Sequence, residues 1–185
     1  MRRLSPARQQ AGFTLIELMI VVIVVSILLA IAAPSFYTVI QENKIRTQAS
    51  RIVSSLNLAR STAAKENITA TLCASSDAAT CTGDTSHFKE GWLVYADRDG
   101  SGTLTSSSDE LVRTYKGLPD SYILELKIDS TEITYYPDGS SSNDGSASGE
   151  EIFKICPPTR DEKQAWSVIV NVLGSPRMKR PDDCS

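Results

Sequence analysis

The feature that most constrains the fold of this chain is a long apolar run close to its start. The stretch from Phe13 to Ala33 contains a single charged side chain, Glu17. About 20 consecutive apolar residues are enough for a helix to cross a bilayer, and this stretch is that long. A carboxylate near membrane depth costs about 2.5–3.5 kcal/mol, so we expect Glu17 to have a function that involves a partner.

The residues before this run are few and basic. Residues 1–12 contain three arginines and no acidic residue, and positive charge holds that end of a membrane segment in the cytoplasm. A secretory signal is normally cleaved after its apolar region. Here the nearest small-residue site, at 30–33, is followed by Pro34 and is a poor one. Cleavage after Gly12 would instead leave the apolar helix on the mature chain.

The motif at this junction, Gly12 to Glu17 (GFTLIE), is specific. Together with the basic leader and the apolar run, it resembles the type III signal of type IV pilins and type II secretion pseudopilins. The resemblance implies that a prepilin peptidase cleaves after Gly12 and N-methylates Phe13. It also implies that Glu17 meets the α-amino group of Phe13 on a neighbouring subunit. The alternative is a plain signal anchor in which Glu17 is incidental.

Charge and cysteine content characterise the chain beyond the apolar run. Loss of the leader changes the formal net charge from −3 to about −6, so we do not expect nucleic acid to bind over the general surface. All four cysteines lie beyond the run, on the periplasmic side, where disulfides persist. Of the three pairings we favour Cys73–Cys81 and Cys156–Cys184, with free thiols as the alternative. The single histidine, His87, lies in a polar stretch and is expected to be a surface residue.

A second helical pattern continues from the apolar run. From Ser35 to Lys65 apolar or small residues recur near the helical period, at Ala49, Ile52, Val53, Leu56, Ala59 and Ala63. The opposite positions carry Arg51, Ser54, Asn57 and Arg60. We expect one long helix whose second half packs on a globular head. Pro34 removes a backbone donor at the junction and is expected to kink or loosen the helix.

From Asn67 onward the pattern changes to short β-like runs separated by turns. The expected strands are Ile68–Cys73, Gly91–Ala96, Leu111–Tyr115, Tyr122–Lys127, Glu132–Tyr136, Ile152–Cys156 and Ser167–Val172. Residues 139–149 are rich in Gly and Ser and are predicted to form a mobile loop.

The sequence therefore predicts an α+β, pilin-like fold, in which a long N-terminal membrane-spanning helix packs on a mainly antiparallel β head. Its segments are a removed leader (1–12), a transmembrane or filament-core helix (13–34), an amphipathic continuation (35–66) and a periplasmic head (67–185). Within the head, residues 91–102 and 109–115 resemble the hairpin of the GspH/FimT family of minor pilins and pseudopilins. The Asp/Gly-rich turn between the two segments is part of that resemblance.

The turn of this hairpin also suggests a calcium site. Asp97, Asp99 and Gly102 match positions 1, 3 and 6 of an EF-hand loop, but Ser101 weakens position 5 and Ser108 replaces the expected Glu. Asp and Gly are also the residues that a tight turn requires. We therefore treat Asp97 and Asp99 as weak metal candidates beside a purely structural turn.

The C-terminus carries a cluster of cations, Arg177, Lys179 and Arg180. Some FimT-like proteins resemble DNA receptors for natural transformation, with a basic motif at a comparable place. Here Ser175 and Pro176 replace the first arginine of that motif. Three cations could bind phosphates weakly, and the alternative is a solvated tail fixed by Cys184.

The function that fits these features is structural. We predict a minor pilin that assembles through its N-terminal helix into a type IV pilus, with prepilin peptidase, other minor pilins and the major pilin as partners and no cofactor. Its place is the inner membrane and then the pilus. The alternatives are a type II secretion pseudopilin, a FimT-like DNA-binding pilin, and a membrane-anchored enzyme. The sequence contains no nucleophile elbow or phosphate loop that would support the enzyme.

Overall fold

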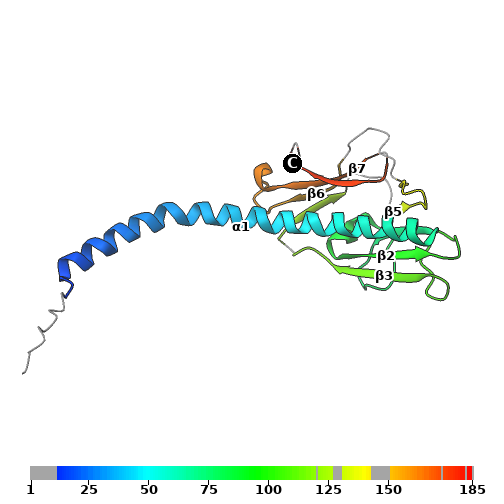
Figure 1. Cartoon of the computed structure of the whole chain (residues 1–185), viewed down its shortest axis with the longest axis horizontal. Coiled ribbons are helices and arrows are strands. Elements are labelled where there is room, and N and C mark those ends of the chain that lie inside the picture. Colours follow the sequence, from blue (N-terminus) through cyan, green and yellow to red (C-terminus); the bar gives the residue numbers. More distant parts are fainter. Residues whose placement is uncertain are drawn as a thin grey trace, which may run out of the picture. The chain divides into compact units, whose positions relative to one another are not determined.

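The computed structural model describes residues 12–119, 121–126, 131–142, 151–171, 173–181 and 183–184 (Figure 1). The chain divides into two compact units, Met1–Val39 and Ile40–Ser185. Helix α1 (Leu15–Glu66) begins in the first unit and ends in the second. The helix agrees with the predicted continuation of the apolar run to Lys65.

The first unit consists mainly of the apolar half of α1. Large apolar side chains from Leu15 to Ile31 are exposed all around the helix. By its length and composition, α1 is suited to crossing a membrane. The backbone stays helical at Pro34. The kink expected there stays a prediction.

Over its described residues the second unit contains two four-stranded sheets in which every pair of neighbouring strands is antiparallel. The first sheet has the order β3 (Glu110–Lys116), β2 (Gly91–Asp97), β1 (Thr69–Ala74) and β5 (Glu132–Tyr135). The second has the order β4 (Ile123–Leu126), β6 (Glu151–Cys156), β7 (Trp166–Val170) and β8 (Pro176–Lys179). The described connections include the short 3-10 helices η1 (Thr85–Lys89) and η2 (Glu162–Gln164). The predicted α+β fold is confirmed.

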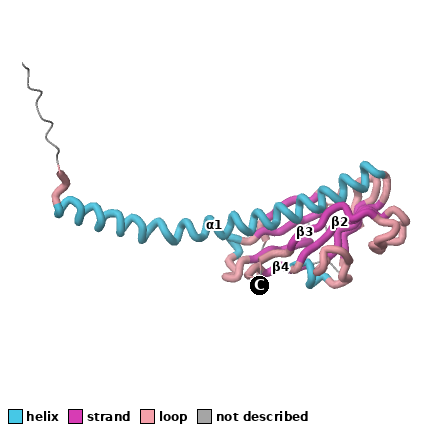
Figure 2. Tube along the Cα trace, turned by 90° about the horizontal axis from the view of Figure 1, so that it is seen from below, coloured by secondary structure: helices cyan, strands magenta, loops and turns pink. Residues whose placement is uncertain are grey.

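The second half of α1 packs against both sheets. In Figure 1 strands β2 and β3 lie on one side of this part of the helix and β6 and β7 on the other, and Figure 2 shows the strands beneath it. The buried face of the helix consists of Ile45, Ala49, Ile52, Leu56, Ala59 and Ala63. It forms one apolar core with side chains from both sheets. The helical periodicity of the sequence therefore identifies the packing face, because a helix on two sheets must bury one continuous stripe.

The two disulfides each fasten a segment to the outer face of a sheet. Cys73 on β1 bonds Cys81, and Cys156 on β6 bonds Cys184 near the C-terminus. This is the pairing that the sequence favours. Cys73, Cys156 and Cys184 are buried, so each bond lies in a small apolar cluster separate from the main core.

The structure corrects the interpretation of the C-terminal cations as part of a solvated tail. Residues 176–179 form β8, which pairs with β7 at the edge of the second sheet. Proline is tolerated at the first residue of an edge strand, and charged residues protect such an edge. The strand is not predicted from the sequence, because proline and cationic residues rarely indicate a β-strand.

Smaller differences concern element ends. Expected strands end within one or two residues of the observed ones, but the expected ends at Lys127 and Val172 lie outside the described residues, as does the predicted mobile loop from residue 143 onward. His87 lies on η1 and is half-buried, rather than in an open loop.

Candidate assembly and binding sites

The predicted processing motif lies at the start of α1, where Thr14 caps the helix. The Thr14 Oγ1 atom accepts a hydrogen bond from the backbone N–H of Glu17 at 3.3 Å. The Thr14 carbonyl accepts one from the N–H of Leu18 at 3.2 Å. Thr-x-x-Glu is the spacing of a capping box, and an acidic side chain is favoured at the positive end of a helix. Glu17 lies in the first turn of α1, where its negative charge is favoured, and its backbone N–H is capped by Thr14.

Gly12 and Phe13 precede this cap, and neither side-chain position makes packing contacts with the described residues around it. A Cβ built on Gly12 meets no atom within 4 Å, and its backbone is outside the left-handed region that favours glycine. The Phe13 side chain is 82% exposed. Packing within the described residues explains neither residue type.

The carboxylates of the β2–β3 turn hold the loop through backbone hydrogen bonds. The buried Asp97 accepts from the N–H groups of Gly100 at 2.8 Å and Gly102 at 2.9 Å, and from the hydroxyl of Thr69 at 3.2 Å. Gly100 and Gly102 have φ values of +72° and +73°, which only glycine adopts at little cost. The turn interpretation of this stretch is thus supported at each glycine.

Asp99 and a carboxylate that sequence spacing did not single out complete the loop. Asp99 accepts from the N–H of Ser101 at 2.9 Å and from the hydroxyl of Ser108 at 2.5 Å. The Ser108 hydrogen bond is the main reason that the pKa of Asp99 falls to about 2. Asp109 accepts from the N–H groups of Arg98 at 2.9 Å and Thr105 at 2.7 Å.

Together Asp97, Asp99 and Asp109 place one oxygen each within 4.8 Å of one another. Such a set could offer hard oxygen ligands to a cation. Each carboxylate oxygen already accepts a hydrogen bond from the loop. The loop is therefore accounted for without an ion, and calcium binding stays a prediction.

The three C-terminal cations do not form one exposed patch. Arg180 donates to the carbonyl of Ala165 at 3.2 Å and forms an ion pair with Glu42 of α1. Arg177 is exposed, and Lys179 is half-buried on β8. The nearby Asp183 accepts from the buried Lys154 at 2.9 Å. Arg180 is thus engaged in contacts within the head. Fewer cations remain available to bind DNA than the sequence suggested.

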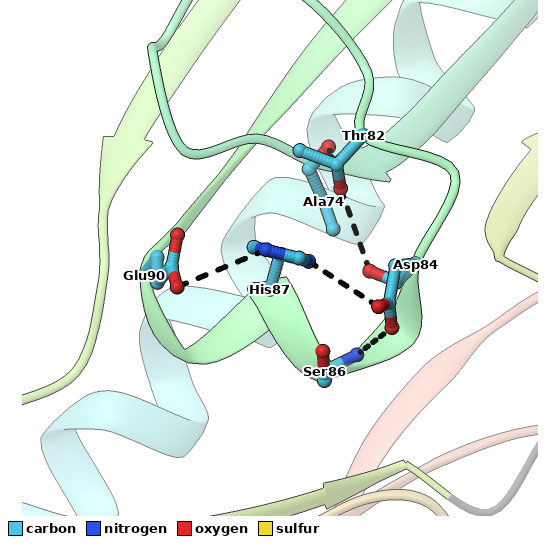
Figure 3. A network of polar contacts seen from close by, with 6 residues as sticks. All are labelled: Ala74, Thr82, Asp84, Ser86, His87 and Glu90. Carbon is cyan, nitrogen blue, oxygen red and sulfur yellow. Dashed lines mark hydrogen bonds and ion pairs between the residues drawn. The ribbon is translucent and has the colours of Figure 1, made fainter.

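The polar network around His87 also serves the fold (Figure 3). His87 lies between Asp84, with Nδ1 to Oδ2 at 3.6 Å, and Glu90, with Nε2 to Oε1 at 3.9 Å. Asp84 caps η1 by accepting from the N–H of Ser86 at 2.8 Å, and this hydrogen bond is the main cause of its lowered pKa. The next residue in η1, Phe88, is buried in the main core. The Asp84 hydrogen bond and the buried Phe88 together hold η1 in place.

These observations define a class of protein. A helix that is apolar and exposed over its first half, packed on an antiparallel head over its second half, and preceded by a Gly-Phe-x-x-x-Glu junction is the architecture of a pilin-like subunit. The chain belongs to the GspH family, described as "Type II transport protein GspH", whose model matches residues 48–174. The "Prokaryotic N-terminal methylation motif" matches residues 7–33. The resemblance drawn from the sequence is confirmed.

Solved structures agree with this assignment at the level of the fold. The Pseudomonas aeruginosa PAO1 type IV minor pilin FimU, in space group P21, has a TM-score of 0.55 and 18% identity, covering 77% of this chain and 96% of FimU. The same FimU in space group P65 has a TM-score of 0.53 and 15% identity, covering 76% of this chain and 99% of FimU.

The minor pseudopilin EpsH of the Vibrio cholerae type 2 secretion system has a TM-score of 0.48 and 13% identity, covering 76% and 99%. A sequence search of curated proteins finds no match. The chain is therefore a GspH-family protein with a pilin-like fold and an apolar N-terminal helix.

Proposed function

We propose that this chain is a minor pilin that assembles through α1 into a type IV pilus. The observation that carries the proposal is the exposed apolar half of α1, joined directly to a half that packs on the head. Within the described residues no side chain covers that apolar half. Apolar helices of this kind are stable either in lipid or against similar helices, and a subunit that passes from membrane to filament needs both environments.

Processing by a prepilin peptidase is part of the proposal. The enzyme cleaves after Gly12 and N-methylates Phe13, and it leaves the head on the periplasmic side of the inner membrane. Support comes from the methylation-motif match over residues 7–33. It also comes from the absence of packing in the described residues that would require Gly12 or Phe13. The two disulfides of the head suit that oxidising compartment.

In the filament we assign Glu17 to the α-amino group of Phe13 on a neighbouring subunit. When a carboxylate and an ammonium group leave water together, their attraction offsets part of the desolvation cost. Burying either charge without a partner would cost far more. The pair would set the axial register of the subunits. Pro34 would permit the helix to adjust between membrane and filament.

A type II secretion pseudopilin is the second candidate, favoured by the family model itself. A deletion strain of the bacterial host separates the two. Loss of surface pili and of twitching, with normal protein secretion, supports the pilus. Loss of secretion with normal pili overturns the pilus proposal and supports the secretion machine. Complementation with the full chain is the control in both cases.

A further inference from the structure

A groove of about 1220 Å³ runs along the outward face of α1, between Asn43 and Ala64. A stripe of small, exposed side chains lines it, spaced alternately four and three residues apart: Asn43, Thr47, Ser50, Ser54, Asn57, Ser61 and Ala64. All seven stripe residues are exposed, whereas the buried face of the same helix consists of other residues, so the stripe faces away from the core. Two of these residues, Ser54 and Asn57, belong to the polar face of α1 that the sequence predicts. The sequence alone indicates no binding partner for that face.

Arginines stand on the side of the groove that borders the first sheet. Arg51 of α1 donates to the backbone oxygen of Lys116, at the end of β3, at 2.6 Å. Arg113 lies within β3 and is exposed. Both side chains line the groove.

Arginines also stand on the opposite side. Arg46 lies over the ring of Trp166 on β7, 5.6 Å from its centroid. Arg60 donates to the backbone oxygen of Leu173, which follows β7, at 3.0 Å. These contacts fix both side chains beside the second sheet while they still line the groove.

The charge of the groove is opposite to that of the chain. Within the described ranges none of the four arginines forms an ion pair with a carboxylate. Among the described residues of the lining, Asp138 is the acidic one; the hydroxyl of Ser140 is the main cause of its lowered pKa, so it stays charged. Four guanidinium groups therefore face one carboxylate, in a chain of net charge −3. The groove is complementary to an anionic partner.

We propose that this groove docks an α-helix of another protein that carries small residues along its contact face and Glu or Asp on both flanks. Residues spaced alternately four and three apart lie along one face of a helix, and small side chains on that face allow a second helix to approach closely. The stripe is about 30 Å long, which accommodates about three heptads. The proposal concerns the head, and it holds whichever machine the chain serves.

The side chains that line the groove favour a helix over a single nucleic-acid strand. Proteins that bind single strands combine positive charge with exposed aromatic rings on which bases stack. The aromatic residue of the lining is Tyr115, which is half-buried and already stacks on Trp92 with ring centroids 5.5 Å apart. The stripe offers small polar side chains in place of such rings.

The test uses the full chain in a nonionic detergent and three labelled probes. The first is a three-heptad helical peptide with Ala and Ser along its seam and Glu on its flanks. The second has Lys in place of each Glu, and the third is a single-stranded oligonucleotide. Fluorescence anisotropy at low salt should show saturable binding of the acidic peptide only. Equal binding of both peptides, or binding of the oligonucleotide alone, overturns the proposal.

Variants then locate the binding on the groove. Ser54→Trp fills its centre at an exposed position and should weaken binding of the acidic peptide at least about tenfold, and Arg113→Glu should weaken it severalfold. The matched control is Arg177→Glu, an exposed cation on β8, which should bind as the wild type does. Circular dichroism confirms that each variant is folded. Wild-type affinity in folded Ser54→Trp overturns the proposal, since the centre of the groove cannot then be the contact.

Discussion

The guanidinium group of Arg180 lies over the indole ring of Trp166, 4.3 Å from the ring centroid. The same guanidinium forms an ion pair with Glu42 of α1. One side chain, just after the last strand, thereby joins the second sheet to the helix. The contact explains why a C-terminal cation that looks available for a ligand is already engaged by the fold.

Replacing Arg180 with Ala should therefore destabilise the protein. We expect a loss of about 1–2 kcal/mol in the free energy of unfolding, mostly from the cation–π contact and the backbone hydrogen bonds, because half-exposed ion pairs contribute little. Urea denaturation of the full chain in detergent measures the loss. Arg177→Ala is the matched control, since Arg177 is exposed, and it should stay within about 0.5 kcal/mol of wild type. Similar losses in the two variants would contradict the assignment.

The helix illustrates what the sequence can predict. Ala49, Ile52 and Leu56 recur at the helical period because one continuous face must be buried, and that requirement is local. The Gly12–Glu17 junction is equally local, as both processing and capping depend on adjacent residues. Long-range contacts follow no such pattern. The sequence places Arg51 and Arg60 on the polar face of the helix, yet Arg51 donates to a backbone oxygen at the end of β3 and Arg60 to one in the β7–β8 connection.

The head illustrates what the sequence cannot predict. Asp109 joins Asp97 and Asp99 only because β3 returns antiparallel to β2, which no spacing rule within the turn expresses. Strand β8 is an edge strand, so its residues are selected to keep the edge soluble and not to resemble a strand. Sequence patterns therefore locate buried faces well, and contacts set by topology poorly.

A buried hydrogen bond between α1 and the first sheet supports a second prediction. The indole N–H of Trp92 donates to the hydroxyl of Ser55 at 3.0 Å, and both side chains are buried. Ser55→Ala leaves that N–H without its partner and should cost about 1–3 kcal/mol. Ser54→Ala, one residue earlier on the exposed face, should be neutral or slightly stabilising, because alanine favours helix. Thermal and urea unfolding compare the pair, and equal stability of the two variants would count against the bond.

The disulfides should differ in their contribution to stability. Cys156–Cys184 spans 28 residues and Cys73–Cys81 spans 8. A cross-link that closes a longer loop removes more entropy from the unfolded chain, about 3–4 kcal/mol for the longer bond against about 2–3 for the shorter. Replacing both cysteines of each pair with Ala, and measuring the urea midpoint, tests this order. A larger loss from the Cys73–Cys81 pair would refute it.

The hairpin loop should lose stability in acid. The pKa of Asp99 is about 2 in the folded chain against 3.8 for the free side chain, chiefly through the Ser108 hydroxyl. Because the folded pKa is the lower one, the stabilisation is complete above 3.8 and is lost as the pH falls toward about 2. In Ser108→Ala the pKa of Asp99 should rise, which NMR titration of the carboxyl group reports. An unchanged pKa would show that Ser108 is not the cause. Asp99→Asn should remove this part of the acid sensitivity.

The role of Glu17 in assembly can be separated from its local effect in the first turn of α1. Glu17→Gln keeps a capping-box side chain but removes the charge, whereas Glu17→Ala removes both. If the carboxylate neutralises the α-amino group of Phe13 on a neighbour, both variants should be processed normally but enter pili poorly. If capping is the whole role, Glu17→Gln should assemble as the wild type does. Immunoblots of sheared pili and of membranes measure incorporation and processing.

Gly12→Asp is the control for processing, because it should leave an uncleaved, heavier precursor in the membrane. Normal incorporation of Glu17→Gln would remove the charge pair from the assembly mechanism.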